Sequence, residues 1–148
     1  MYSPDPSGAV AEMHRVLRPG GKAVATVWGE RRNCGWADVF PIVDKRVASE
    51  ICPMFFATGA PGGLTRDFEQ AGFDDIREHR QSEVLEFASA RDLLDAVLLG
   101  GPVAPAVKRF DAATMGEVCD EFLESVADFR DGVTYRIPGE FVTVAGTR

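Results

Sequence analysis

Apolar residues near the amino terminus recur at the spacing of an α-helix and are followed by a short, nearly continuous apolar run. The pair Asp5-Pro6 suits the start of a helix, because an aspartate caps the first turn and proline fits its first position. The apolar positions that share helical spacing are Val10, Met13, Val16 and Leu17. Pro19-Gly20-Gly21 ends this helix. The run Ala23–Trp28 is too short for an ordinary helix, so it predicts a strand covered on both faces, as in a parallel sheet.

The alternation of helices and strands continues to residue 87. A second helix that begins near Asp38 accommodates Pro41 in its first turn. A short helix over Leu64–Ala71 ends at Gly72. Phe73–Phe87 is predicted to be an outer strand with a solvent-exposed face, because its middle is polar throughout. This order of elements predicts an α/β fold.

Residues 88–130 have helical periodicity in place of strand patterns. Ser89–Asp92 resembles a capping box with Asp in place of Glu, and Thr114–Glu117 is a better match to the same motif. An apolar stripe follows each of them, as in amphipathic helices that pack on a core. We therefore expect a helical insertion that forms a cap or lid over about residues 88–130.

The carboxyl-terminal segment returns to extended structure. Val133–Ile137 and Glu140–Ala145 predict two extended pieces that are separated by Pro138-Gly139. We expect residues 1–148 to form a single domain with these terminal strands, the earlier α/β elements and the helical lid.

Composition narrows the class of protein. The 148 residues are 45% hydrophobic and 26% charged, which is typical of one globular domain. A net charge of −7 argues against a general binder of nucleic acid or of anionic membranes. The three widely spaced cysteines form no CxxC pair and fit a reducing cytosol. There is no signal-peptide pattern and no apolar run near the ~20 residues that span a bilayer, so a soluble cytoplasmic protein is expected.

Most motifs of catalytic chemistry are missing from the chain. The two histidines, His14 and His79, have no ligand partners at metal-binding spacing, so no metal site is predicted. There is no GxSxG elbow and no P-loop. The glycine-rich stretch at 59–63 precedes a predicted helix but does not fit GxGxxG, and we interpret it as a loop and helix start.

A set of aromatic residues is the best candidate for a binding pocket. Open α/β sheets bind ligands outside the carboxyl ends of their strands, and an aromatic residue ends the buried strand of this chain. The set consists of Trp28, Trp36, Phe55 and Phe56. Core packing beneath the lid helices is the alternative interpretation of these side chains.

Four segments resemble class I S-adenosylmethionine-dependent methyltransferases, in the order that the family has them. Glu12–Lys22 contains Arg-Val-Leu-Arg-Pro-Gly-Gly after an acidic residue, which resembles the helix and turn before the family's fifth strand. Tyr2–Pro6 resembles the end of the fourth strand and the loop after it. Gln70–Phe73 resembles the segment before the sixth strand, and Glu140–Gly146 resembles the last strand. The Leu-Arg-Pro-Gly-Gly element is the most specific of these matches.

The resemblance implies the carboxyl-terminal half of such an enzyme, with a partial Rossmann-like sheet and a lid insertion. The family's glycine-rich cofactor loop and the acidic residue that holds the ribose have no counterpart in this chain. By resemblance, Tyr2 and Pro4 would lie near the cofactor, S-adenosylmethionine, and the four aromatic residues with the lid helices would shape the pocket of a small-molecule acceptor. No catalytic base is identifiable. We expect this half alone to bind the cofactor weakly or not at all, and whether it is an enzyme stays open.

The same resemblance predicts an uncovered sheet edge and leaves alternative functions open. The family's fourth strand, which flanks the equivalent of Ala23–Trp28, is almost absent here, so that edge would expose unpaired backbone groups. We expect a second copy in a homodimer, a missing amino-terminal portion or a separate partner chain to cover it. A non-catalytic remnant or dimerising interaction module of the same fold is the main alternative. A small-ligand binder that uses a pocket under the lid is a third possibility.

Overall fold

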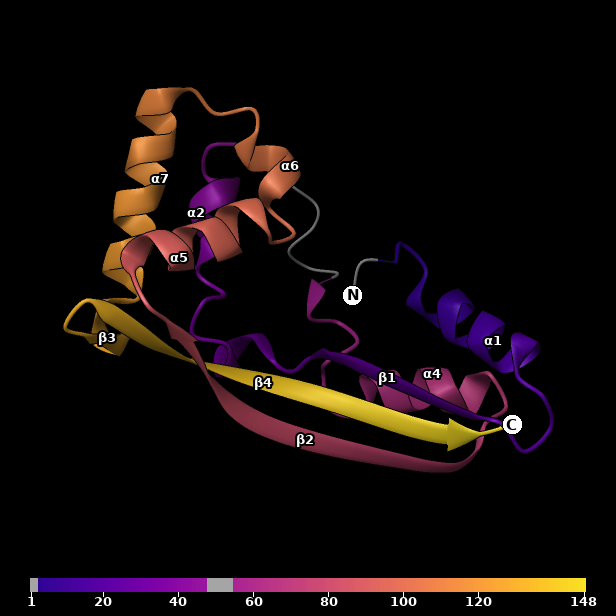
Figure 1. Ribbon diagram of the computed structural model, residues 1–148. Coiled ribbons are helices and arrows are strands. Elements are labelled where there is room, and N and C mark those ends of the chain that lie inside the picture. Colours follow the sequence, from indigo (N-terminus) through magenta and orange to yellow (C-terminus); the bar gives the residue numbers. More distant parts are fainter. Residues whose placement is uncertain (1–2, 48–54) are drawn as a thin grey trace. The chain divides into compact units, whose positions relative to one another are not determined.

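The computed structural model describes residues 3–47 and 55–148, which belong to two compact units (Figure 1). Unit 1 comprises Met1–Asn33, Met54–Ser82 and Glu140–Arg148, and unit 2 comprises Cys34–Pro53 and Glu83–Gly139. Tyr2 lies outside the described residues. The expectation that residues 1–148 form a single domain stays a prediction.

The chain has a mixed α/β structure whose strands form one four-stranded sheet with antiparallel pairing. The sheet has the order β1-β4-β2, and the short strand β3 pairs with β4. The strands are β1 (Lys22–Trp28), β2 (Asp74–Phe87), β3 (Arg130–Asp131) and β4 (Thr134–Thr147). β1 runs antiparallel to β4 in a register from Lys22↔Thr147 to Trp28↔Phe141. Within the described residues, β1 is therefore an edge strand.

The core of unit 1 lies on one face of this sheet. Helices α1 (Pro6–Val16) and α4 (Gly63–Gln70) cover that face (Figure 1). The buried side chains that share this core include Val10, Val27, Phe68, Phe73 and Val142. The expectation that β1 is covered on both faces is wrong for the described part of the chain, because Val24 is 60% exposed. The apolar run is continuous, but only alternate side chains point into the core.

Local signals position the first helix and strand. The Asp5 carboxylate accepts a hydrogen bond from the Gly8 N–H at 2.9 Å, which confirms the predicted cap. Gly20 has a φ of +77°, a conformation that glycine adopts without strain. Its N–H donates to the Arg148 carbonyl at 2.6 Å, and the Arg148 N–H donates to the Gly21 carbonyl at 2.8 Å. The turn before β1 is thus attached to the end of β4.

The later elements of unit 1 largely follow the sequence. The predicted helix Leu64–Ala71 corresponds to α4, and Gly72 follows it with a φ of +87°. The 3-10 helix η1 (Arg31–Asn33) follows β1. The predicted outer strand corresponds to β2, which begins at Asp74 and is exposed along most of its length.

Unit 2 is mainly helical and has its own buried core. Its helices are α2 (Val39–Asp44), α5 (Ala90–Leu94), the π-helix η2 (Asp95–Leu99), α6 (Ala104–Val107), α7 (Ala112–Ser125) and the 3-10 helix η3 (Ala127–Phe129). Phe40 and Phe122 are fully buried. Glu121 of α7 accepts hydrogen bonds from Lys45 at 2.5 Å and from Arg46 at 2.6 Å, which connect α7 to the end of α2.

Two boundaries in this region differ from the sequence prediction. α7 begins one turn earlier than the Thr114 capping box implies, because the Asp111 carboxylate caps it by accepting the Thr114 N–H at 2.8 Å. Pro138-Gly139 does not separate two strands, since β4 is continuous. The proline has no N–H to leave unpaired, and its carbonyl accepts a hydrogen bond from the Gly35 N–H at 2.9 Å.

No helix in the described part of the chain is long and apolar enough to cross a membrane.

Candidate functional site at the carboxyl end of β1

An aromatic pair marks the carboxyl end of β1. Trp28 is the last residue of the strand, and its ring stacks on that of Phe141 with a centroid distance of 4.3 Å and an interplanar angle of 28°. The two residues are register partners, and their side chains lie on the face of the sheet opposite α1 and α4. On the same face, the Thr26 and Thr143 hydroxyls share a hydrogen bond of 2.9 Å. Adjacent cross-strand pairs therefore hold this end of the strand in place.

Beyond Trp28 the chain bends around the buried side chain of Glu140. The Gly29 N–H donates to the Glu140 carbonyl at 2.7 Å, which extends the β1–β4 pairing by one bond. The Glu30 N–H then donates to Glu140 Oε2 at 2.8 Å. A Cβ atom on Gly29 would lie 2.0 Å from that same oxygen. A side chain at position 29 would therefore have to displace the carboxylate, which fixes the backbone that leaves the strand.

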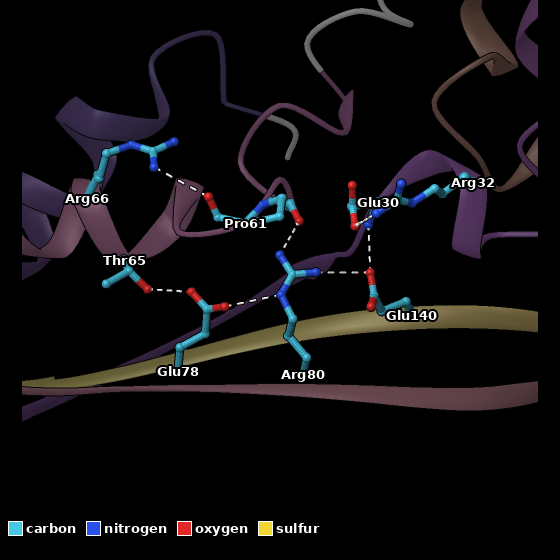
Figure 2. Close-up of polar contacts among 9 residues, drawn as sticks. Glu30, Arg32, Pro61, Thr65, Arg66, Glu78, Arg80 and Glu140 are labelled. Atoms are coloured by element: carbon cyan, nitrogen blue, oxygen red, sulfur yellow. Dashed lines mark hydrogen bonds and ion pairs between the residues drawn. The ribbon is translucent and has the colours of Figure 1, made fainter.

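Arg80 of β2 connects this bend to two other segments (Figure 2). Its guanidinium donates to Glu140 Oε2 at 3.1 Å, to the Gly59 carbonyl at 2.7 Å and to Glu78 Oε1 at 3.1 Å. The Thr65 hydroxyl donates to the other oxygen of Glu78 at 2.5 Å. We call these residues (Glu140, Arg80, Glu78, Thr65 and the Gly59 carbonyl) the Glu140 network. It joins β4, β2, α4 and the loop before α4.

The Glu140 carboxylate is held in its ionised form. Burial on its own would raise the pKa of this carboxyl, but the Glu30 N–H, the Asn33 side chain and the Arg80 guanidinium all stabilise the anion. Together they hold the pKa of Glu140 below its ordinary value of 4.5. A carboxylate with so many donors is a weak base, so its role is to position the chain.

A second close approach holds the loop before α4 against the end of β1. A Cβ atom on Gly59 would lie 1.9 Å from the Trp28 carbonyl oxygen. Just before it, the Phe55 and Phe56 rings meet edge to face at 5.1 Å, and both side chains are buried. The loop that carries these two rings therefore reaches the end of β1 at Gly59.

The structure distributes the predicted pocket residues between the two units. Trp28, Phe55 and Phe56 belong to unit 1, and Trp36 belongs to unit 2. Trp36 is buried and lies 6.0 Å from the Phe40 ring at a tilted angle. Pro4 is exposed just before α1. Lining of one acceptor pocket by the four aromatic residues stays a prediction.

None of the four aromatic residues lines either of two hollows that each lie within one unit. One, of about 340 Å³, lies on the open face of the sheet in unit 1. Its lining residues are Lys22, Val24, Asp75, Arg77, Ala145, Gly146 and Thr147. The other, of about 350 Å³, lies in unit 2 between η2 and α7. The described residues contain no cluster of three side chains that could hold a metal ion.

Sequence reasoning missed the Glu140 network. A signal for it does exist, because Glu140 is a charged residue at the start of the apolar stretch Phe141–Val144. A carboxylate in such a place requires a partner when it is buried. The partner, Arg80, lies in the most polar part of β2, where a single arginine does not stand out.

Comparisons with known proteins find distant similarity among solved structures. No protein family model matches the sequence, and no curated protein matches it. Among solved structures, the chain is similar to the crystal structure of a "putative methyltransferase" from Bacillus halodurans C-125, with 17% sequence identity and a TM-score of 0.48. The match covers 97% of this chain and 58% of that chain. The described structure therefore spans little more than half the length of that protein.

Proposed function

We propose that this chain is the carboxyl-terminal half of an S-adenosylmethionine-dependent methyltransferase that acts on a small molecule. The observation that carries the proposal is the helix–turn–strand segment formed by α1, the turn Leu17–Gly21 and β1. The methyltransferase-like motif Leu-Arg-Pro-Gly-Gly occupies that turn, between a helix that ends at Val16 and a strand that begins at Lys22. The segment that resembles the one before the family's sixth strand leads into β2, and the segment that resembles the last strand lies in β4 of the same sheet.

The described residues do not by themselves make a site for S-adenosylmethionine. Pro4 has no side-chain hydrogen-bonding group, and it is exposed. The Glu140 network, the best-built polar feature of unit 1, is directed at the chain itself and has its donors and acceptors engaged. We therefore assign the cofactor to a portion outside this chain and derive no step of methyl transfer through it.

The part proposed for this chain is to hold one wall of the acceptor site. Methyl transfer depends mainly on aligning donor, methyl group and acceptor, so a rigid wall contributes directly to the rate. The Trp28–Phe141 stack offers an aromatic surface, and Glu30 follows it with a partly exposed carboxylate that pairs with Arg32 at 2.8 Å. Both stand at the carboxyl end of β1, where open sheets bind their ligands.

The proposal also requires that the edge of β1 be paired. An edge strand presents a row of backbone N–H and C=O groups that can bind another strand. We propose that a strand of the missing amino-terminal portion pairs with β1. If a second copy takes that place instead, the alternative of a dimerising module is favoured, and the exposed Val24 beside the edge supports such a role.

Calorimetric titration with S-adenosylmethionine tests the proposal. The 148-residue chain is expected to bind in the millimolar range or not at all, and the polypeptide extended through the upstream reading frame is expected to bind in the micromolar range. Micromolar binding by the chain alone would overturn the assignment of the cofactor site to another portion. An upstream stop codon with an independent promoter would contradict the methyltransferase half and favour the interaction module.

Light scattering on the purified chain tests the covered edge. We expect the purified chain to associate with itself or, when the upstream portion is added, to form a complex with that portion. A stable monomer that binds little hydrophobic dye at unit 1 would contradict the proposal that β1 needs a partner.

A further inference from the structure

The helical unit contains an apolar hollow that no part of the proposed function uses. It lies between the η2 segment and α7 and has a volume of about 350 Å³. That volume falls within the roughly 300–1,000 Å³ that is typical of small-molecule pockets. Its walls are formed by the side chains of Leu94, Leu98, Leu99, Met115 and Cys119, with Arg91 and Asp95 beside them.

The backbone of η2 has an unusual geometry at this wall. The Gly100 N–H donates to the Asp95 carbonyl at 3.0 Å, a bond that spans five residues and widens the last turn of the α5–η2 segment. Single π-turns of this kind are frequent at functional sites. Leu99, which ends the widened turn, is 59% exposed even though it borders the hollow.

The opposite wall is built from one face of α7. Met115 and Cys119 stand one helical turn apart and are both half-buried, whereas Val118 on the inner face is fully buried. Leu94 on the first wall is half-buried as well. These side chains are therefore partly covered by their own unit and are left in contact with the space between the helices.

The charges around the hollow restrict what it can bind. Arg91 is the only cation among the lining residues, and Asp95 lies 3.6 Å from it. Burial first, and then the carboxylates of Asp120 and Asp95, raise the pKa of the Cys119 thiol above its ordinary value. The thiol is therefore neutral at pH 7. An anionic molecule would meet one carboxylate, that of Asp95, and one cation, Arg91, which already pairs with it.

We infer that this hollow is a binding site for a neutral, apolar small molecule. The walls supply dispersion contacts and remove apolar surface from water, and the thiol contributes no charge. The inference uses residues of unit 2 alone, so it holds whether or not the chain is part of a methyltransferase.

A pair of matched fluorescent probes tests the inference. N-phenyl-1-naphthylamine is neutral, and 8-anilino-1-naphthalenesulfonate has the same ring system with a sulfonate added. We expect the neutral probe to saturate at one molecule per chain and to bind at least roughly tenfold more tightly than the anionic probe. Binding that does not saturate, or equal binding of the two probes, would overturn the inference.

Three variants place the binding. Cys119→Phe fills the hollow, and Met115→Gln makes its wall polar, whereas Val133→Gln removes an apolar residue of the same unit that is 73% exposed and does not line it. We expect the dissociation constant of the neutral probe to rise roughly tenfold or more in the first two variants and to stay unchanged in the third. Equal effects of Met115→Gln and Val133→Gln, with unchanged circular dichroism, would overturn the inference.

Protection of the thiol gives a readout that does not depend on folding of a core variant. In a Cys52→Ser background, the neutral probe is expected to slow alkylation of Cys119 by N-ethylmaleimide at least fivefold at saturation, because it covers that side chain. Unchanged alkylation would contradict binding in the hollow. A probe affinity that falls with rising protein concentration would show instead that a second copy or a helix of a partner occupies this surface.

Discussion

Replacing Glu140 with glutamine tests whether the Glu140 network positions the end of β1. The variant keeps the shape of the side chain but removes the charge that faces the Arg80 guanidinium and the Glu30 N–H. A hydrogen bond to a charged group contributes about 1.5–3 kcal/mol to stability. The Arg80 side chain is 26% exposed, so in the variant water replaces part of the lost interaction. We expect the free energy of unfolding to fall by about 2 kcal/mol.

The control is Glu86→Gln, which removes the charge of an exposed cross-strand pair. Glu86 pairs with Arg136, and their side chains are 64% and 55% exposed. Exposed pairs of this kind contribute little, so a change of less than about 0.5 kcal/mol is expected. Urea unfolding at pH 7, followed by circular dichroism and tryptophan fluorescence, measures both variants. If Glu140→Gln costs no more than Glu86→Gln, the positioning role of Glu140 is refuted.

The pH dependence of the same variant separates charge from packing. Because the pKa of Glu140 is lowered in the folded protein, its ionised form stabilises the fold above the unfolded-state pKa, and this contribution is lost as the pH falls through the folded-state pKa. The gap in stability between the wild type and Glu140→Gln is therefore expected to be constant near neutral pH and to close below the ordinary value of 4.5. A gap that persists undiminished at pH 3 would attribute the loss to packing.

Further substitutions test other contacts described above. Gly59→Ala is expected to lower the free energy of unfolding by about 3 kcal/mol, because its Cβ atom would overlap the Trp28 carbonyl. Gly116→Ala, in a helix with open space around it, is expected to raise it by about 0.5–1 kcal/mol, and urea titrations that rank the two alike would contradict the close approach. A double-mutant cycle with Trp28→Ala, Phe141→Ala and the double variant should give a coupling free energy of about 0.5–1.5 kcal/mol. Losses of stability that simply add would contradict the stack. Alkylation of Cys119 by iodoacetamide should reach half its maximal rate above pH 9.0, since burial and nearby carboxylates raise the pKa of the thiol, and a midpoint below that value would argue against the described surroundings.

The parts of the fold that the sequence predicts are those with a local physical cause. Asp5 caps α1 through its own carboxylate, and Gly72 ends α4 with a positive φ, so each signal lies within a few residues of its effect. Ser89 likewise caps α5 by accepting the Asp92 N–H. Such contacts do not depend on how distant segments meet.

The parts that the sequence does not predict depend on long-range partners. Glu140 and Glu30 are 110 positions apart, and no local pattern brings them together. Pro138, within the continuous strand β4, likewise accepts a hydrogen bond from Gly35, which lies far from it in the sequence. The open face of β1 is a third feature that the sequence does not predict, because β-branched residues favour a strand whether or not a second layer covers them. Trp28 is a sequence candidate because it ends the apolar run Ala23–Trp28. The Glu140 network is not predicted, because its members are far apart in the sequence.

The two neighbouring strands β2 and β4 carry the chain into and out of most of unit 2. The chain leaves unit 1 within β2, after Ser82, and returns to it within β4, at Glu140, so the helices between residues 88 and 133 are inserted between two strands of one sheet. Such an arrangement permits modular evolution, because the inserted helices can be replaced or lengthened while the β1–β4 register stays the same. Descendants of one ancestral sheet could in this way acquire different ligand preferences by exchanging a single contiguous stretch of gene for this insertion.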